Sequence, residues 1–220
     1  ASFVINVGGV DKLLYQGKKV TERIEVVVYE GDNSYSLSLL EADGRLVVEH
    51  EELGYKGFYE SNKKDIANNQ TETSLKSYQG MKRGEYIKQY MSQIRKFHFH
   101  DTGRRSPFTN DSHVINDSYR MYDQGQNLAA ILYRIHNEDE KAYRRIVKVI
   151  QSVAPYFNDF YFEPTEADMI RLQWQDKYSS MIYGPNDLSD GSIRFIALAK
   201  LFRKQNLPKV ISIDEPELGL

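Results

Sequence analysis

The chain contains no cysteine in its 220 residues, which excludes disulfide bonds, thiolate metal ligands and cysteine nucleophiles. It also has no signal-peptide pattern and no apolar run near the roughly 18–20 residues that a membrane-spanning helix needs. No internal repeat and no low-complexity tract is present. These absences predict a soluble protein of the cytoplasm that does not contact a membrane.

An excess of charge of one sign is also lacking, because 29 Lys and Arg residues face 31 Asp and Glu residues. The basic pairs are scattered along the chain rather than pooled: Lys18-Lys19, Lys63-Lys64, Lys82-Arg83, Arg104-Arg105 and Arg144-Arg145. A constitutive nucleic-acid-binding stripe is therefore not visible. The length allows one large domain or two small ones with an ample core.

One further absence concerns chemistry. The sequence has no G-x-x-x-x-G-K-[ST] run, the loop whose backbone cradles the phosphates of a bound nucleotide. Two other motifs that suit phosphate and magnesium chemistry are nevertheless present. The first is LSDGSIR at 188–194, a small-residue turn before an apolar helix, and the second is VISIDEP at 210–216, an apolar strand that ends in two carboxylates.

In the first motif, Gly191 lets another backbone or a ligand approach closely. The helix that is expected to begin near Ser192 directs its first N–H groups and the positive end of its dipole outward, which favours a γ-phosphate there. The simpler alternative is that Ser189 or Asp190 is only a helix N-cap, the commoner role of a short Ser-Asp-Gly run in isolation. The second motif downstream favours the phosphate interpretation.

In the second motif, the strand delivers Asp214 and Glu215 to its carboxyl end, where open α/β sheets bind ligands. We expect Asp214 to hold Mg²⁺ largely through water, and Glu215 to polarise the water that attacks the γ-phosphate of ATP. Pro216 is expected to keep Glu215 extended. The alternative is an acidic turn that merely follows a strand; the paired motifs favour the ATP interpretation.

A metal site is a weaker possibility at His98, His100 and Asp101, with His113 as a candidate third ligand. The alternation of these histidines with Phe97 and Phe99 favours a strand with one core face and one wetter face. The pair Arg104-Arg105 is interpreted as solvated loop charge.

Apolar periodicity predicts an α/β fold with a large antiparallel contribution. We expect four segments: a β-rich subdomain over 1–60, a polar loop over 61–83, a helical lobe over 84–155, and an α/β core over 156–220. The polar stretch 60–80 is expected to be a surface loop or a short solvated helix.

Within these segments, alternation predicts an antiparallel meander over 21–50. Helical spacing predicts three helices of one lobe, over 84–95, 128–135 and 139–153. Strands are expected over 160–162, 170–174 and 180–183, and then a helix that is apolar all round over 192–204 and a buried strand over 210–213.

Taken together, the segments 188–194 and 211–220 resemble the signature and Walker B motifs of ABC-type ATPases of the SMC and RecF kind. More narrowly, they look like the predicted AAA-family ATPases of bacteria that are related to RecF and to the overcoming-lysogenization-defect proteins. Less specific similarity extends over 8–15, 97–102 and 125–130. Asp190 stands where transporter ATPases usually have a second glycine, so the resemblance disfavours membrane transport.

The resemblance implies a partial P-loop ATPase head, with a Walker A strand, loop and helix before residue 1 and a switch histidine after the last residue. It implies ATP and Mg²⁺ as cofactors and an ATP-driven homodimer, in which Ser189, Gly191 and Ser192 of one protomer contact the γ-phosphate bound by the other. Hydrolysis through Asp214 and Glu215 would reopen the pair. DNA repair or maintenance, or phage defence, is the implied setting, with DNA or a nuclease as a possible partner; the chain alone is expected to be inactive.

Two alternatives remain open at this point. The chain could be a non-catalytic module that binds DNA or another protein. It could also be a metal-dependent hydrolase or nuclease that uses Asp214, Glu215 and Glu217. Such sites usually gather carboxylates from several strands, and no second strand that ends in a carboxylate can be identified from the sequence, so this alternative ranks last.

Overall fold

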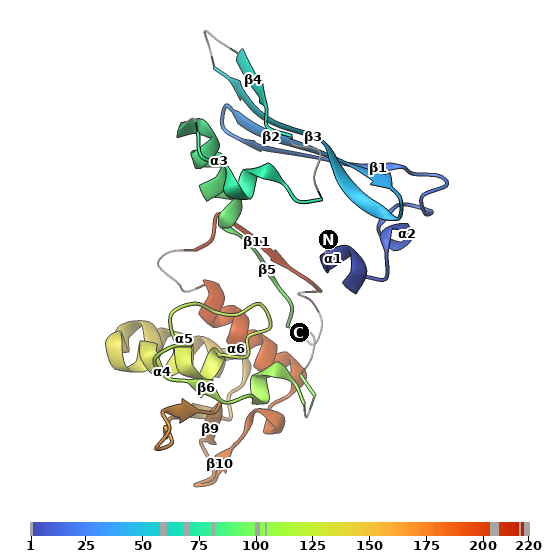
Figure 1. The fold of residues 1–220 in the computed structure, drawn as a ribbon. Coiled ribbons are helices and arrows are strands. Elements are labelled where there is room, and N and C mark those ends of the chain that lie inside the picture. The colour runs from blue at the N-terminus through green and yellow to red at the C-terminus, as the bar shows by residue number, and fades with distance from the viewer. Residues whose placement is uncertain are drawn as a thin grey trace. The chain divides into compact units, whose positions relative to one another are not determined.

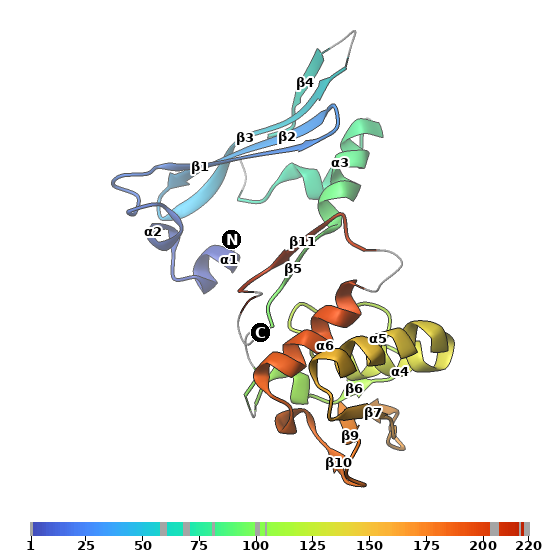
Figure 2. The same cartoon turned by 180° about the vertical axis from the view of Figure 1, so that it is seen from behind.

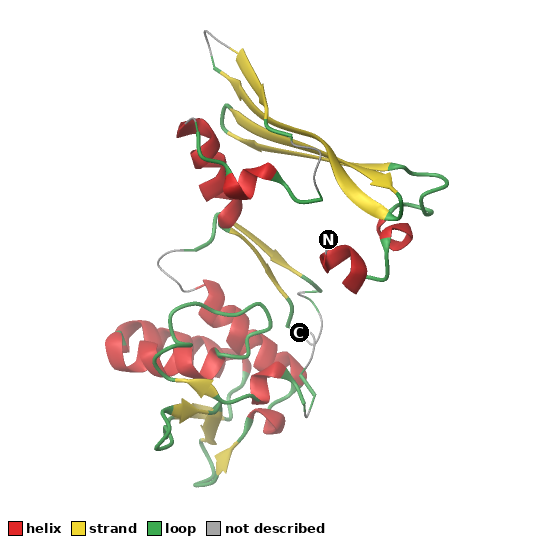
Figure 3. Ribbon diagram, viewed as in Figure 1, coloured by secondary structure: helices red, strands yellow, loops and turns green. Residues whose placement is uncertain are grey.

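The computed structural model describes residues 2–57, 61–67, 71–80, 82–99, 102–103, 105–202, 207–215 and 217 (Figure 1). The chain divides into two compact units, Ala1–Gln93 and Ile94–Leu220. Each unit mixes helices with strands, as the sequence predicts (Figure 3). No helix in the described ranges is both long enough and apolar enough to cross a bilayer.

The first unit begins with two short helices, α1 (Ser2–Asn6) and α2 (Val10–Leu13), and continues into an antiparallel sheet. The four strands pair in chain order: β1 (Arg23–Glu30), β2 (Asn33–Ala42), β3 (Arg45–Lys56) and β4 (Ser61–Asp65). This confirms the meander predicted over 21–50. Asp43 and Gly44 both have positive φ, 51° and 76°, which is the type I′ geometry that an Asp-Gly turn gives to a tight hairpin.

The polar stretch after this meander is more ordered than the sequence predicts. Strand β4 pairs with β3, and a 3₁₀ turn, η1 (Ser74–Ser77), follows it. The expectation of a loop or short helix was wrong for β4, because this edge strand contains no apolar residue and so has no apolar alternation by which to predict it. Helix α3 (Lys82–Ser92) then covers the sheet, and Tyr35, Leu75 and Ile87 form the buried centre of this unit.

The second unit is built around three helices: α4 (Leu128–Glu138), α5 (Glu140–Val153) and α6 (Asp190–Phe202). Helix α5 packs on both of the others (Figure 2). Its buried residues, Tyr143, Ile146, Val147 and Ile150, follow the helical spacing seen in the sequence. The lobe expected over 84–155 is therefore divided, since α3 lies in the first unit and α4 and α5 lie in the second.

Short strands complete the second unit. Three form an antiparallel sheet in the order β10-β9-β7: β10 (Ile182–Tyr183), β9 (Gln173–Asp176) and β7 (Phe157–Tyr161). Two others, β6 (Ser112–His113) and β8 (Met169–Ile170), pair with each other. Strands were predicted from the sequence at the places of β7, β9 and β10, and Trp174, Phe157 and Phe160 from them join the core.

The most consequential pair of strands is parallel. Strand β5 (Ile94–Phe97) lies beside β11 (Val210–Ile213), with Ile94 opposite Val210 and Phe97 opposite Ile213. The bounds of β11 match the predicted strand, but its burial does not: β11 alternates between exposed and half-buried residues, and Val210 is 38% exposed. In the described part of the chain β5 is its one neighbour, so the strand lacks the cover of a central position.

Helix α6 also differs from its prediction. It buries Ile193, Ile196, Ala197 and Leu201, whereas Phe202 is 55% exposed. The helix is therefore packed on one side rather than apolar and buried all round. Its apolar composition nevertheless places four side chains in the main core of the second unit.

Candidate functional site

The turn before α6 holds the first group of predicted site residues. Ser189 is the N-cap: its Oγ accepts a hydrogen bond from the backbone N–H of Ser192 at 3.1 Å. The Ser189 and Ser192 hydroxyls also lie 2.8 Å apart, and the Tyr156 hydroxyl reaches Ser192 Oγ at 3.3 Å. The alternative interpretation of Ser189 as a cap is thus confirmed, because its side chain satisfies one of the helix's orphan N–H groups.

The same turn keeps donors available at the start of the helix. The first intrahelical hydrogen bond runs from Ile193 N to Ser189 O at 3.1 Å. The amides of Asp190 and Gly191 precede it, at the positive end of the helix dipole. Gly191 is half-buried and adds no side chain to this surface. The cap and an anion site are therefore compatible functions of one turn.

The second group of residues lies at the carboxyl ends of β5 and β11. Asp214 follows β11, and its backbone N–H donates to Phe97 O at 3.2 Å, which extends the parallel pairing by one residue. Its Oδ2 lies 3.2 Å from His98 Nδ1 and 3.5 Å from Lys96 Nζ. The Asp214 side chain is 45% exposed, so it remains open to water and to ligands.

Glu215 departs from the prediction. Its φ is 45°, in the left-handed region, and not the extended conformation expected before Pro216. A non-glycine residue pays a conformational cost there, and such residues gather at functional sites. The effect is to turn the chain sharply immediately after Asp214. Glu215 itself is exposed, while Pro216 lies outside the described residues.

The structure connects the two groups through α6. Arg194, in the first turns of that helix, donates from Nε to Phe99 O at 2.8 Å, just beyond the end of β5. Ser189 and Ser192 are brought together, and Asp214 is brought to His98 and Lys96. Lys96 was not predicted as a site residue from the sequence, and neither was the contact between His98 and Asp214. The signal in the sequence was weak, since Arg95 and Lys96 interrupt the apolar residues of 94–97, whereas 210–213 is apolar apart from Ser212.

A hollow of about 550 Å³ opens beside His98. Arg95, Arg120, Tyr122 and Asp123 help to line it, and Arg95 pairs with Asp123 at 2.6 Å. The His98 N–H donates to Asp123 O at 2.8 Å, so this wall is tied to the strand end. The lining of the hollow therefore combines two guanidinium groups with the carboxylate of Asp123, which already pairs with Arg95.

Asn127 fixes the loop that carries this wall. Its side chain is 1% exposed, and its Nδ2 donates to Asp117 O and Arg120 O at 2.6 Å each. Its Oδ1 accepts from Tyr122 N at 2.9 Å. A buried amide with three backbone partners holds the loop in one shape.

The metal interpretation of the histidines gains no support. His113 uses its Nδ1 to approach the Ile115 and Asn116 amides, at 3.3 Å each, and so closes a turn. Among the described residues no three His, Asp or Glu side chains are grouped as metal ligands, and His100 and Asp101 lie outside those residues. Arg105 is exposed, as a solvated loop charge would be, while Arg104 lies outside the described part of the chain.

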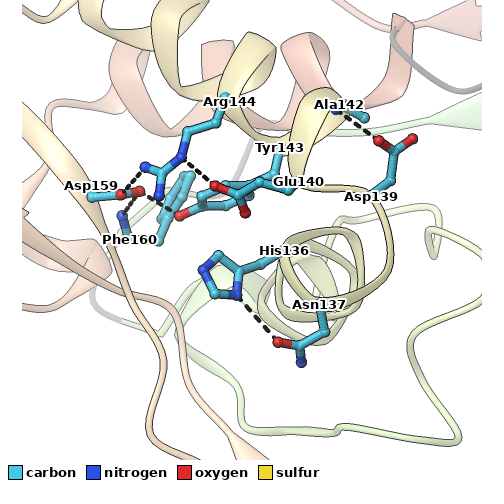
Figure 4. A network of polar contacts seen from close by, with 9 residues as sticks. All are labelled: His136, Asn137, Asp139, Glu140, Ala142, Tyr143, Arg144, Asp159 and Phe160. Atoms are coloured by element: carbon cyan, nitrogen blue, oxygen red, sulfur yellow. Dashed lines mark hydrogen bonds and ion pairs between the residues drawn. The ribbon is translucent and has the colours of Figure 1, made fainter.

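A second polar network, in Figure 4, is structural. Asp159 of β7 accepts hydrogen bonds from the Tyr143 hydroxyl and from Phe160 N, and it pairs with Arg144 at 2.6 Å. Burial, and then the contact with Asp159, raise the pKa of Tyr143 well above its ordinary value, so the phenol stays a proton donor. This network ties α5 to β7.

Comparison of the chain with models of protein families, with curated proteins and with solved structures finds no match.

Proposed function

We propose that these 220 residues belong to the ATP-binding and ATP-hydrolysing head of an ABC-type ATPase of the SMC and RecF kind. Such a head would dimerise when it binds ATP, and this dimerisation would serve DNA repair or maintenance or phage defence. The observation that carries the proposal is the parallel pairing of β5 with β11, which sets Asp214 beside His98 and Lys96 at one edge. Ligands of α/β sheets bind at such carboxyl ends.

Asp214 suits a magnesium ion that keeps most of its water. A single half-exposed carboxylate is a sufficient protein ligand when phosphate oxygens supply others, so a three-residue metal cluster is not required. The bound ion would neutralise charge that develops on the phosphates. Lys96 and His98 hold the Asp214 carboxylate in place, and Glu215, turned outward by its left-handed backbone, is assigned the attacking water.

Ser189, Gly191 and Ser192 act in trans in this proposal. Their turn presents two hydroxyls and the leading amides of α6, which are donors for the γ-phosphate of ATP bound by a second protomer. The sequence contains no phosphate-cradling G-x-x-x-x-G-K-[ST] run, so the proposal assigns that cradle to residues outside these 220.

The test compares ATP turnover by the 220-residue chain and by a longer form of the protein that includes a phosphate-binding loop. We expect turnover only in the longer form. Glu215→Gln should lower kcat by about 100-fold or more, because general-base assistance contributes roughly 10²–10⁴. It should also trap an ATP-bound dimer, which light scattering after size-exclusion chromatography measures.

Glu217→Gln is the matched control, since Glu217 is an exposed carboxylate two positions away, and its turnover should equal that of the unmodified protein. Unchanged turnover in Glu215→Gln would remove Glu215 as the base. If every form is inactive with ATP and the chain shifts DNA in a salt-dependent way, the non-catalytic module is the correct function.

A further inference from the structure

The first unit contains a hollow of about 320 Å³, and none of the residues of the candidate functional site lines it. Its floor is the paired β3 and β4, where Tyr55 lies opposite Asn62 and Leu53 opposite Lys64. Residues directly opposite in an antiparallel pair share one face of the sheet. Its walls come from α3 and from Tyr78. The volume lies within the range of small-molecule pockets, which begins near 300 Å³.

Aromatic rings and cations alternate around this hollow. The Arg83 guanidinium carbon lies 3.7 Å from the centroid of the Tyr55 ring, which is a stacked arrangement. Lys64 Nζ lies 5.6 Å from the centroid of the Tyr78 ring. Flat guanidinium and phenol surfaces of this kind are what proteins stack nucleobases against.

The charge of the hollow is positive. Its basic side chains are those of Lys64 and Arg83, and none of its ten described lining residues is acidic. Lys63 lies opposite Gly54, on the other face of the β3–β4 pair, and its Nζ pairs with Glu52 at 2.9 Å. The fold thus gathers basic residues that are separated in the sequence, and an anionic group is the complement of such a surface.

Gly84 shapes the wall next to Tyr78. A Cβ at this position would lie 2.3 Å from Tyr78 Cε1 and 2.9 Å from Leu53 Cδ1. A glycine therefore lets the Tyr78 ring lie flat against the start of α3. Leu53 and the buried Ile87 make the inner end of the hollow apolar, which suits the body of a base rather than its phosphate.

We propose that this hollow binds a nucleotide unit, with its base stacked on the Arg83–Tyr55 pair or on Tyr78 and its phosphate near Lys64. The same chemistry is presented by a free mononucleotide and by an unpaired nucleic-acid strand. The site shares no residue with the Asp214 region, and it stands or falls independently of the proposed ATPase activity.

The test is calorimetric titration of the 220-residue protein, without magnesium, with AMP, with single-stranded oligodeoxyadenylate and with inorganic phosphate. Arg83→Ala should weaken binding by about tenfold, in line with the worth of one stacked base. Lys64→Ala should weaken it to a similar degree, because it removes the ammonium group that lies near the phosphate. Arg45→Ala is the matched control, because Arg45 is an exposed arginine at the other end of β3, and it should bind as the unmodified protein does.

Each result has one meaning. AMP that binds as tightly as the oligonucleotide identifies a free nucleotide as the ligand, whereas tighter oligonucleotide binding that weakens with salt identifies an unpaired strand. If inorganic phosphate binds as tightly as AMP, the proposed stacking of the base is overturned. The same holds if Arg83→Ala and Arg45→Ala bind AMP with equal affinity. Circular dichroism checks that each variant is folded. Tyr55→Phe keeps the aromatic ring and should retain binding. If the folded, unmodified protein binds none of the probes, the proposal is overturned.

Discussion

Glu51 is fully buried in the first unit, where its carboxylate accepts three hydrogen bonds. The donors are the Tyr35 hydroxyl at 2.8 Å, Ser74 N at 2.7 Å and Leu75 N at 2.9 Å. One side chain of β3 thereby fixes both β2 and η1. A buried carboxylate is tolerated because its oxygens are this well satisfied.

Glu51→Ala should lower the free energy of unfolding of the first unit by about 3 kcal/mol, because it leaves buried donors without an acceptor. Urea denaturation followed by circular dichroism measures the loss. Glu25→Ala, at an exposed position of β1, should change it by less than about 0.5 kcal/mol. A loss no larger in Glu51→Ala than in Glu25→Ala would refute this role.

Tyr35 and Tyr143 make stability depend on alkaline pH. Burial raises the pKa of both phenols well above the ordinary value, and the carboxylates Glu51 and Asp159 add to the effect. The folded state therefore keeps a proton that the unfolded state loses above about pH 10. The stabilisation is fully present below that pH and is lost as the pH rises.

We expect the urea midpoint of unfolding to decrease as the pH is raised from 9 to 11. Above about pH 10, the free energy of unfolding should decrease by about 1.4 kcal/mol per pH unit for each buried phenol. Tyr35→Phe and Tyr143→Phe should each flatten this dependence. Tyr178→Phe serves for comparison, since Tyr178 is 86% exposed, and should leave the slope unaltered. A slope that survives both buried substitutions would show that other groups titrate.

At the scale of elements, the turn before α6 combines a structural role with the proposed functional one, and substitutions separate the two. Ser189→Ala should cost about 1 kcal/mol of stability, the usual worth of a serine cap. Ser189→Asp restores a capping oxygen and should be nearly as stable as the unmodified protein. In a longer form that hydrolyses ATP as proposed, however, its negative charge should abolish turnover by repelling the γ-phosphate.

Thermal denaturation and ATP turnover, measured on the same preparations, test this separation. A Ser189→Asp protein that is stable and still hydrolyses ATP would limit Ser189 to capping. Asp187→Asn, a change of charge in the 3₁₀ turn just upstream, controls for general electrostatic effects.

Much of the secondary structure was predictable from the sequence, because a long run of apolar residues at helical spacing, such as the one in α5, identifies a helix. Strand β5 was only partly predictable: its first two residues, Ile94 and Arg95, were assigned to a helix expected to reach residue 95, whereas α3 ends at Ser92. Its last residue, Phe97, lies in the stretch that alternation assigned to a strand. Pairing is harder still, since periodicity says which face a residue occupies but not which strand lies beside it. The contact of His98 with Asp214 depends on that pairing and stayed hidden for the same reason.

At the scale of the whole molecule, the two units divide the chain at a position that composition does not mark. Gln93 alone lies between α3 and β5, without a proline- or glycine-rich linker, so the change from one core to the other is invisible in the sequence. Each unit nevertheless has its own buried centre. The proposed nucleotide hollow lies in the first unit and the Asp214 edge in the second.

The parallel pair of β5 and β11 also has a consequence for the order in which the chain folds. Residues 98–209 lie between the two strands, so their pairing is among the most distant contacts along the chain. Closing so large a loop is entropically expensive, and contacts of this kind form late. During synthesis on the ribosome, β5 must wait for β11 to emerge, while α4, α5 and α6 can already pack. We therefore expect the edge that holds Asp214 and His98 to assemble late, and slow protection of its amides in pulse-labelled refolding would show this.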